Sequence, residues 1–183
     1  MAQAPTLHDF EVQLSHVDRG LDAKLAFRTA RHPSETLERL WLRALAYCLW
    51  HEERLAFGPG LSDPDAPDLE TRDYTSRLTR WIRVGKPDPA KVQRAADQNA
   101  GAKVAVLFES PERMQAFIAE AREAGLERLG QVELAAVAPE LLRELARDET
   151  RRAKVSLTVV GDHLYMERAG KSFDGELARG SAD

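Results

Sequence analysis

The chain has a single cysteine, Cys48, among 183 residues, and this scarcity limits the kinds of site it can carry. One cysteine forms no internal disulfide, so we expect no disulfide partner, and it cannot build a cysteine-rich zinc centre. No apolar run approaches the roughly 18 residues that span a bilayer. The first ten residues lack the basic and apolar regions of a signal peptide. We therefore expect a cytoplasmic protein that makes no membrane contact.

Positive charge is also in short supply. The 26 lysines and arginines are outnumbered by 30 acidic residues, which gives a net charge of −4. A protein that grips phosphate backbones over a broad face needs an excess of positive charge there. The composition excludes that mode of binding and leaves room only for a small basic groove.

Several motifs for metals and phosphates are missing. The stretch His51-Glu52-Glu53 lacks the second histidine of a zinc-protease helix. The aspartates between residues 63 and 73 lack the glycine and the terminal glutamate of a calcium loop. A glycine-rich phosphate loop is absent as well. The acidic stretch therefore fits a solvated loop better than a calcium site.

The sequence does have apolar residues at two characteristic spacings, that of strands and that of helices. Alternation predicts strands over 9–16 and 22–28, a hairpin within 67–88 and a final hairpin over 155–166, and continuous apolar runs predict strands over 104–108 and 132–138. Helices are expected to start at Pro33, Pro89, Pro111 and Pro139, and the first should end near Arg54. This order favours a mixed α/β (α+β) sheet flanked by helices, with antiparallel hairpins at both ends. We expect one domain over residues 1–168 and a polar, flexible tail over 169–183.

Glu38 is a candidate site residue because of its position on the first predicted helix. At about 100° per residue it falls inside the apolar arc of that helix. A carboxylate there is costly unless it is paired or hydrogen-bonded. It either pairs with an arginine such as Arg43, Arg31 or Arg83, or serves as an acid in a cleft. Glu35 falls at the edge of the arc and is less informative.

The hairpin within 67–88 supplies a second set of polar candidates. A turn near residue 75 places Arg83 opposite Asp68 at the open end of the hairpin, with Asp65 close by. One reading is a structural cross-strand pair, worth about 0.2–1 kcal/mol. The other is a polar site completed by Glu38 from the preceding helix.

Four short segments share a pattern with a known family. They are ARHPSET at residues 30–36, Glu38-Arg39, Gly60-Leu61 before an acidic, proline-containing loop, and WIRVG at residues 81–85 followed by Pro87-Asp88. With these segments the chain resembles the YaeQ family of bacterial proteins, from its first strand to about residue 168.

That resemblance implies a variant of the PD-(D/E)XK fold, the restriction-endonuclease-like fold. Its core is a helix, three antiparallel strands, a second helix and a further strand. In such nucleases an acid starts the second strand, a Glu-x-Lys ends the third, and a helix glutamate often completes the set. Two carboxylates hold Mg²⁺, which activates water. Carried over to this chain, the strand acid is Asp68, with Asp65 as second choice, and the helix acid is Glu38. Gly85 stands at the lysine position and Lys86 follows it.

One position departs from the family. YaeQ-like chains usually carry a glutamate where this chain has Arg83. A guanidinium stays charged at any working pH. It would pair with Glu38 and Asp68 and repel a divalent cation. We therefore predict that metal-dependent cleavage is lost or very weak.

Two functions follow from the resemblance. The first is an interaction module without a cofactor, which binds a nucleic acid or a protein partner through Arg31, Trp81, Arg83 and Lys86. The second is a Mg²⁺-dependent nuclease or phosphodiesterase. It would hold the ion with Glu38, Asp68 and possibly Asp65, and Lys86 would stabilise charge.

Overall fold

The computed structural model describes residues 4–182 and has a mixed α/β fold. The strands are β1 (Thr6–His16), β2 (Leu21–Arg31), β3 (Ala56–Phe57), β4 (Leu69–Arg72), β5 (Leu78–Gly85), β6 (Lys103–Phe108), β7 (Glu133–Val137), β8 (Arg152–Val160), β9 (His163–Arg168) and β10 (Lys171–Gly180). The helices are α1 (Leu37–Leu49), α2 (Pro89–Gln98), α3 (Pro111–Glu123) and α4 (Pro139–Ala146), with short 3-10 turns at Val17–Arg19, Gly60–Ser62 and Glu127–Gln131.

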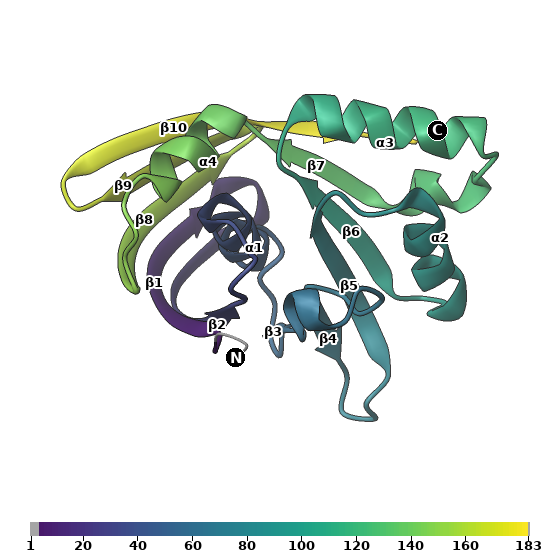
Figure 1. Ribbon diagram of the computed structural model, residues 1–183, viewed down its shortest axis with the longest axis horizontal. Coiled ribbons are helices and arrows are strands. Elements are labelled where there is room, and N and C mark those ends of the chain that lie inside the picture. Colours follow the sequence, from purple (N-terminus) through teal and green to yellow (C-terminus); the bar gives the residue numbers. More distant parts are fainter. Residues whose placement is uncertain (1–3, 183) are drawn as a thin grey trace.

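The ten strands form one nearly closed, mixed sheet in the order β2-β1-β8-β9-β10-β7-β6-β5-β4-β3. Strands β5, β6 and β7 run parallel, as expected where helices α2 and α3 form the crossovers. The predicted N-terminal hairpin is confirmed by the antiparallel pairing of β1 with β2. The sheet curves around α1, which lies inside the curve (Figure 1).

Two hydrophobic cores lie on opposite faces of this sheet. The larger one fills the curve between α1, α4 and the inner faces of strands from both halves of the sheet. The smaller one lies between strands β5–β7 and the helices α2 and α3. Strands β5 to β7 are therefore covered on both faces, which explains the uninterrupted apolar run in β6.

The predicted register of the β4–β5 hairpin is confirmed. Leu69 lies opposite Ile82 and Glu70 opposite Trp81, and the Asp68 backbone N–H donates to the Ile82 carbonyl at 2.9 Å. The pairing of β4 with β5 is irregular between Thr71 and Arg72, close to the turn. The open end of the hairpin therefore brings residues 68 and 83 to the same edge of the sheet.

The first helix starts four residues later than the sequence predicts. Thr36 is its N-cap, since the Thr36 hydroxyl accepts from the Arg39 N–H at 3.2 Å. Residues 32–35 form a turn instead, closed by a bond from the Glu35 N–H to the His32 carbonyl. The helix also ends at Leu49 and not near Arg54, whose φ of +70° is incompatible with a helix.

The expected flexible tail is a strand. From Lys171 the chain forms β10, which pairs with β9 on one side and β7 on the other. Ala169 and Gly170 both have positive φ, the backbone of a tight hairpin turn that reverses the chain. Main-chain hydrogen bonds to β9 and β7 hold β10 in place although it has few apolar side chains. The polar composition of this segment therefore gave a wrong prediction.

Among the described residues, no helix is long and apolar enough to cross a membrane. Cys48 is a free, buried thiol in the larger core. Its burial raises the pKa of the thiol to about 12, so it stays protonated at neutral pH.

Candidate functional site

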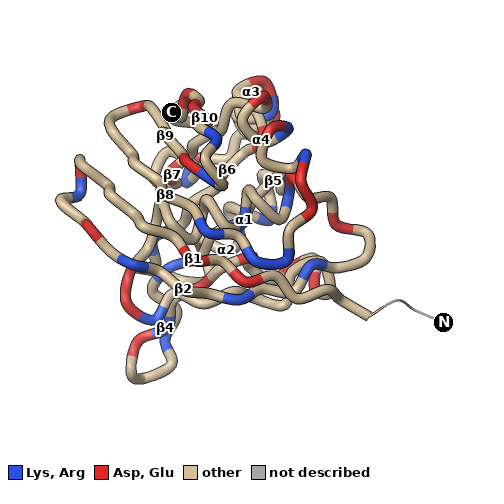
Figure 2. Tube along the Cα trace, turned by 90° about the vertical axis from the view of Figure 1, so that its left-hand side faces the viewer, with Lys and Arg blue, Asp and Glu red and all other residues tan. Residues whose placement is uncertain are grey.

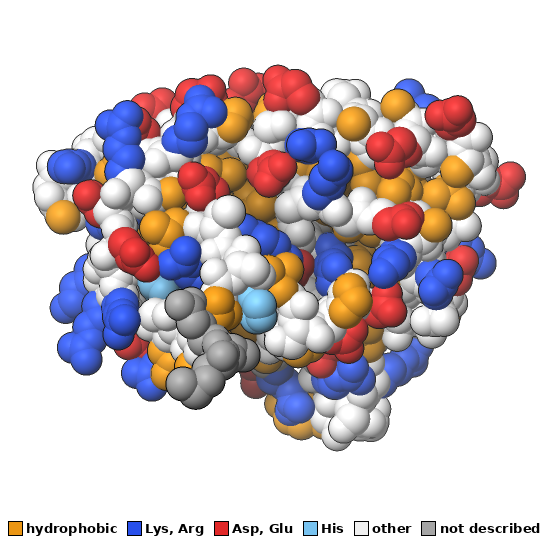
Figure 3. Space-filling model, in the orientation of Figure 1, with side chains coloured by type: hydrophobic (Ala, Val, Ile, Leu, Met, Phe, Trp, Pro, Cys, Tyr) orange, Lys and Arg blue, Asp and Glu red, His pale blue; other side chains and the backbone are white. Residues whose placement is uncertain are grey.

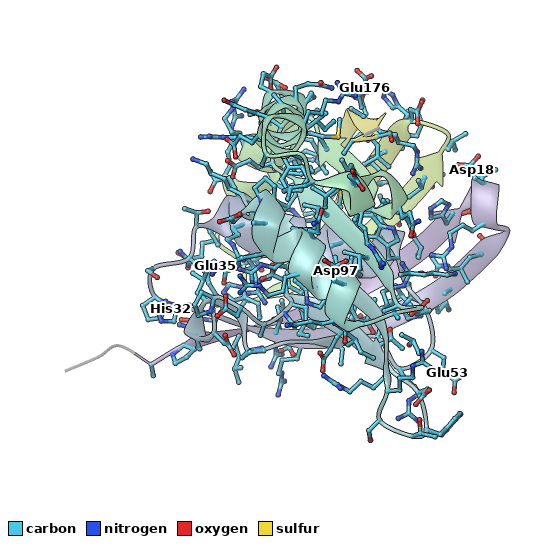
Figure 4. The ribbon with its side chains drawn as sticks, turned by 90° about the vertical axis from the view of Figure 1, so that its right-hand side faces the viewer. Asp18, His32, Glu35, Glu53, Asp97 and Glu176 are labelled. Carbon is cyan, nitrogen blue, oxygen red and sulfur yellow. The ribbon has the colours of Figure 1, made fainter. Side chains whose placement is uncertain are left out.

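Two buried carboxylates meet where α1 begins and the β4–β5 hairpin opens. Glu35 lies on the turn that precedes α1 and is 3% exposed, and Asp68 lies directly before β4 and is fully buried. Figure 4 labels Glu35 and His32 close together, beside the start of α1. Buried carboxylates are costly unless they are paired, so their partners define the site.

Arg39 joins the two carboxylates. Its Nη1 lies 2.9 Å from Glu35 Oε1 and its Nη2 lies 2.7 Å from Asp68 Oδ1. Burial lowers the pKa of the Arg39 guanidinium, but the charges of Asp68 and Glu35 and their hydrogen bonds outweigh burial and raise it. One guanidinium therefore connects the first turn of α1 to the edge of the sheet.

The remaining carboxylate oxygens also have donors. Asp68 Oδ2 accepts from the Val84 N–H at 2.9 Å. Arg43, which is 2% exposed, grips Glu35 with Nε on Oε1 and Nη2 on Oε2, both at 2.7 Å. This fork geometry is the strong, bidentate form of the arginine–carboxylate pair.

These contacts leave poor ligands for a metal ion. A Mg²⁺ ion needs carboxylate oxygens with open lone pairs and room for its water molecules. Here the oxygens of Asp68 and Glu35 already accept from guanidinium and backbone donors. Within residues 4–182, no group of three His, Cys, Asp or Glu side chains could hold an ion. The residues present do not fit a nuclease-type metal centre.

Arg83 lies beside this cluster, in looser contact than its strand position indicates. Its Nε is 3.9 Å from Asp68 Oδ2. Its Nη2 donates to the Pro64 carbonyl at 2.8 Å, and its Nη1 donates to the Ala66 carbonyl. Arg83 thus fastens the 61–68 loop to β5, and Arg39 makes the close pair with Asp68.

Glu38 does not form the ion pair considered for it. It is half-buried on the first turn of α1. Within the described part of the chain it makes no hydrogen bond and no ion pair through its side chain. Arg43 pairs with Glu35, and Arg31 pairs with Glu149 at 2.8 Å. The acid with buried partners is Glu35, which the later start of α1 moves off the helix.

The other predicted site residues lie outside the cluster. Asp65 is exposed and pairs with Lys91 at 2.7 Å, and the hydrogen bond from Lys91 lowers the pKa of its carboxyl group. Trp81 is only 5% exposed, packs in the smaller core and lines a surface pocket of about 360 Å³ beside α2. Lys86 is exposed, one residue past the end of β5.

Four guanidinium groups gather around the two buried carboxylates. The guanidinium groups of Arg39, Arg43 and Arg83 surround two carboxylates, and Arg31 joins them by donating to the Glu35 carbonyl at 2.9 Å. The side chains of Arg31, Arg39 and Arg83 are each 17–23% exposed. Figure 3 shows lysine and arginine side chains near the centre of one face of the molecule.

Sequence reasoning missed the pair of Glu35 with Arg39 and Arg43, although a signal was present. The three residues are spaced four apart, the spacing that places side chains on one side of a helix. The assumed helix start at Pro33 made Glu35 a helix residue at the edge of the apolar arc and hid this relation.

Comparison with known proteins gives consistent matches. A family model described as YaeQ protein matches residues 1–177. Uncharacterised YaeQ proteins of Escherichia coli K12 and Salmonella typhi are 39% identical over 102 residues and 38% identical over 98 residues. The matched regions cover 55% and 54% of this chain and the same shares of those relatives. The chain thus spans about half the length of the curated relatives it matches.

Two crystal structures match over the whole fold. The YaeQ protein of Xanthomonas axonopodis pv. citri has a TM-score of 0.88 at 28% identity and covers 98% of this chain and 100% of its own. The YaeQ protein of Pseudomonas syringae has a TM-score of 0.87 at 31% identity, with 100% of both chains covered.

Proposed function

The chain belongs to the YaeQ family, and from that premise we propose that it is a non-catalytic protein that binds nucleic acid on a restriction-endonuclease-like scaffold. The observation that carries this proposal is Arg39, which occupies both buried carboxylates at the position where a nuclease of that fold would hold its metal.

The order of elements supports the scaffold. Helix α1 is followed by the antiparallel strands β3, β4 and β5, then by α2, and then by β6 parallel to β5. Helices α1 and α2 pack on opposite faces of these strands. This sequence of helix, three strands, helix and strand is the core that the family resemblance implies.

The chemistry of the cleft supports the loss of catalysis. Asp68 stands before β4, where the strand acid of a nuclease stands, but it is fully buried and bonded to Arg39 and the Val84 N–H. Binding a metal there requires Arg39 to give up its charge-assisted hydrogen bonds to Asp68 and Glu35. Cleavage by Glu38 and Asp68 is therefore the less favoured function.

The clustering of guanidinium groups supports an anionic ligand. Arginine forks match phosphate oxygens bidentately, and such charge-assisted bonds are about twice as strong as neutral ones. Arg31, Arg39 and Arg83 keep part of their surface in solvent while their other donors are fixed. A net charge of −4 over the whole chain argues against phosphate binding on a broad basic face and favours this arginine cluster.

Fluorescence anisotropy with labelled oligonucleotides tests the proposal. We expect Arg83→Glu to weaken binding by at least about tenfold, because a charge-assisted bond is replaced by repulsion. The matched control is Arg143→Glu on α4, whose partner Glu140 is equally exposed, and we expect the affinity to change by less than about twofold. Flat titrations of the wild-type protein with every oligonucleotide would contradict the proposal.

A further inference from the structure

The β4–β5 hairpin projects from the body of the molecule (Figure 1). Its turn carries an exposed aromatic ring, that of Tyr74. Tyr74 is 83% exposed, whereas the other exposed large hydrophobic side chains of the described chain are 40–55% exposed. Single exposed hydrophobic side chains are common on protein surfaces, so it is the surroundings of the Tyr74 ring, not its exposure alone, that indicate what it can bind.

The ring is held in place from one side. The Arg54 guanidinium carbon lies 4.5 Å from the centroid of Tyr74, in cation–π geometry. Arg54 has a φ of +70°, unusual for a residue other than glycine, and its Nε donates to the Arg72 carbonyl at 2.9 Å. The Tyr74 hydroxyl also contacts Glu53 Oε1 at 3.5 Å. One face of the ring is therefore fixed on a cation.

The turn that carries the ring is itself well ordered. Asp73 Oδ1 accepts from the Thr75 N–H at 2.8 Å, from the Thr75 hydroxyl at 2.7 Å and from the Arg77 N–H at 3.0 Å. The Thr75 hydroxyl bond is the main reason that the pKa of Asp73 is lowered. A rigid loop loses little conformational entropy on binding, so this turn is preorganised.

The surroundings of Tyr74 favour a planar ligand. Its turn neighbours Thr75 and Ser76 are polar and exposed, so the apolar ring of contacts that encloses a protein hot spot is missing. Arg72, at the end of β4, forms a fork with Glu70, and the Arg77 Nη2 donates to the Ala100 carbonyl, so these two exposed cations beside the turn already have partners. Every nucleobase offers a π face, and stacking on aromatic side chains is the usual mode of single-strand recognition.

We propose that Tyr74 is a stacking platform for an unpaired nucleobase, and that the ligand of this protein is single-stranded nucleic acid. This inference rests on the proposed function, because the arginine cleft supplies the phosphate contacts. Arg83 and Tyr74 lie at opposite ends of the hairpin, about 20 Å apart at roughly 3.3 Å per strand residue. At the roughly 3.4 Å rise of stacked bases, a strand of about six nucleotides reaches from Arg83 to the ring, and a more extended strand needs fewer.

Anisotropy titrations with a single strand of about twelve nucleotides and the duplex of the same sequence test the inference. We expect Tyr74→Ala to weaken binding of the single strand by roughly 5- to 150-fold, and Tyr74→Phe to keep wild-type affinity because the ring remains. Tyr165→Ala, which removes another exposed ring on β9, is the matched control and should bind like the wild type.

The outcomes separate the two proposals. Wild-type affinity of Tyr74→Ala for the single strand, together with weakened binding by Arg83→Glu, overturns the stacking platform and leaves the proposed function standing. Tighter binding of duplex than of single strand by the wild type also overturns the platform. No binding of any oligonucleotide by the wild type overturns both. Because Tyr74 is exposed, its variants should unfold at the wild-type urea midpoint, which excludes a folding defect.

Discussion

At the scale of residues, Arg39 is the group on which the site depends. Two carboxylates that are almost completely buried, Glu35 and Asp68, share its guanidinium. Among the described residues, no other arginine pairs with both. A buried ion pair contributes little net stability compared with an apolar replacement, but removing one partner strands the other as an uncompensated charge. The cluster should therefore be sensitive to single substitutions.

Arg39→Ala should lower the free energy of unfolding by about 3–5 kcal/mol, because the buried Asp68 loses its close ion pair and Glu35 keeps only Arg43. Urea denaturation at neutral pH measures the loss. The control is Arg147→Ala, which removes an exposed pair with Glu144 and should change stability by less than about 0.5 kcal/mol. A loss below about 1 kcal/mol for Arg39→Ala would show that water reaches the cluster.

Two histidines make stability depend on pH. Burial lowers the pKa of His16 below its usual 6.5, and burial also lowers that of His51, with the nearby Arg19 adding to both shifts. Where the folded pKa is the lower one, the unfolded chain binds more protons, so stability falls as the pH drops from about 6.5 toward the folded value.

We therefore expect the urea midpoint to decrease between about pH 7 and pH 5, and the decrease to be smaller in His16→Phe, which cannot take up a proton. His163→Phe, which replaces a more exposed ring on β9, serves as the control. A midpoint that rises on acidification, or the same slope in His16→Phe as in the wild type, contradicts this origin.

At the scale of elements, strand β10 decides how the two halves of the sheet are joined. It is hydrogen-bonded to β9 along Lys171–Glu176 and to β7 along Leu177–Gly180. Gly175 lets α4 approach the strand, because a Cβ there would lie 3.1 Å from the Leu141 Cβ. Without β10, β7 and β9 would each present an unpaired edge.

A chain that ends at Gly170 should consequently lose cooperative unfolding. Circular dichroism during heating measures this, and we expect a broad transition in place of a single sharp one. Ending the chain after Gly180 leaves β10 intact and provides the control. A truncated chain that melts as sharply as the control, at a similar temperature, would mean that β10 is dispensable.

The elements that sequence predicts well are those whose signals are local. The register of β4 with β5 follows from one turn and from alternation, and β6 follows from its apolar run. The start of α1 depends on competition between Pro33 and the cap Thr36, which the pattern alone does not decide. Strand β10 is set by main-chain pairing with distant strands, and its side chains are mostly polar.

At the scale of the whole molecule, the site arises where distant segments meet. Pairing within the hairpin predicts that Asp68 and Arg83 are neighbours. The contact of Arg39 with Asp68 depends on how α1 lies against the end of β5. Gly85, which has a φ of +90°, ends β5 close to Arg39. A Cβ built on Gly85 would lie 3.9 Å from the Arg39 Nε. No local pattern encodes this approach.

Charge over the rest of the surface is mixed, and both signs are interspersed along the exposed strands of the curved sheet (Figure 2). The proposed phosphate contacts are therefore limited to three arginines, Arg31, Arg39 and Arg83. For single strands the affinity should fall with a logarithmic salt slope near −2, or about twentyfold between 50 and 200 mM salt. A slope steeper than about −4 would point to a broader basic face.

The most direct test of a filled, non-catalytic centre is the affinity for a labelled single-stranded oligonucleotide in EDTA and in Mg²⁺ at matched ionic strength. Arginine contacts need no metal, so we predict binding in EDTA that is at least as tight as in Mg²⁺, with the oligonucleotide intact after incubation. Binding that requires Mg²⁺, or an oligonucleotide shortened in its presence, would contradict the assignment of Arg39 as the occupant of the acidic centre.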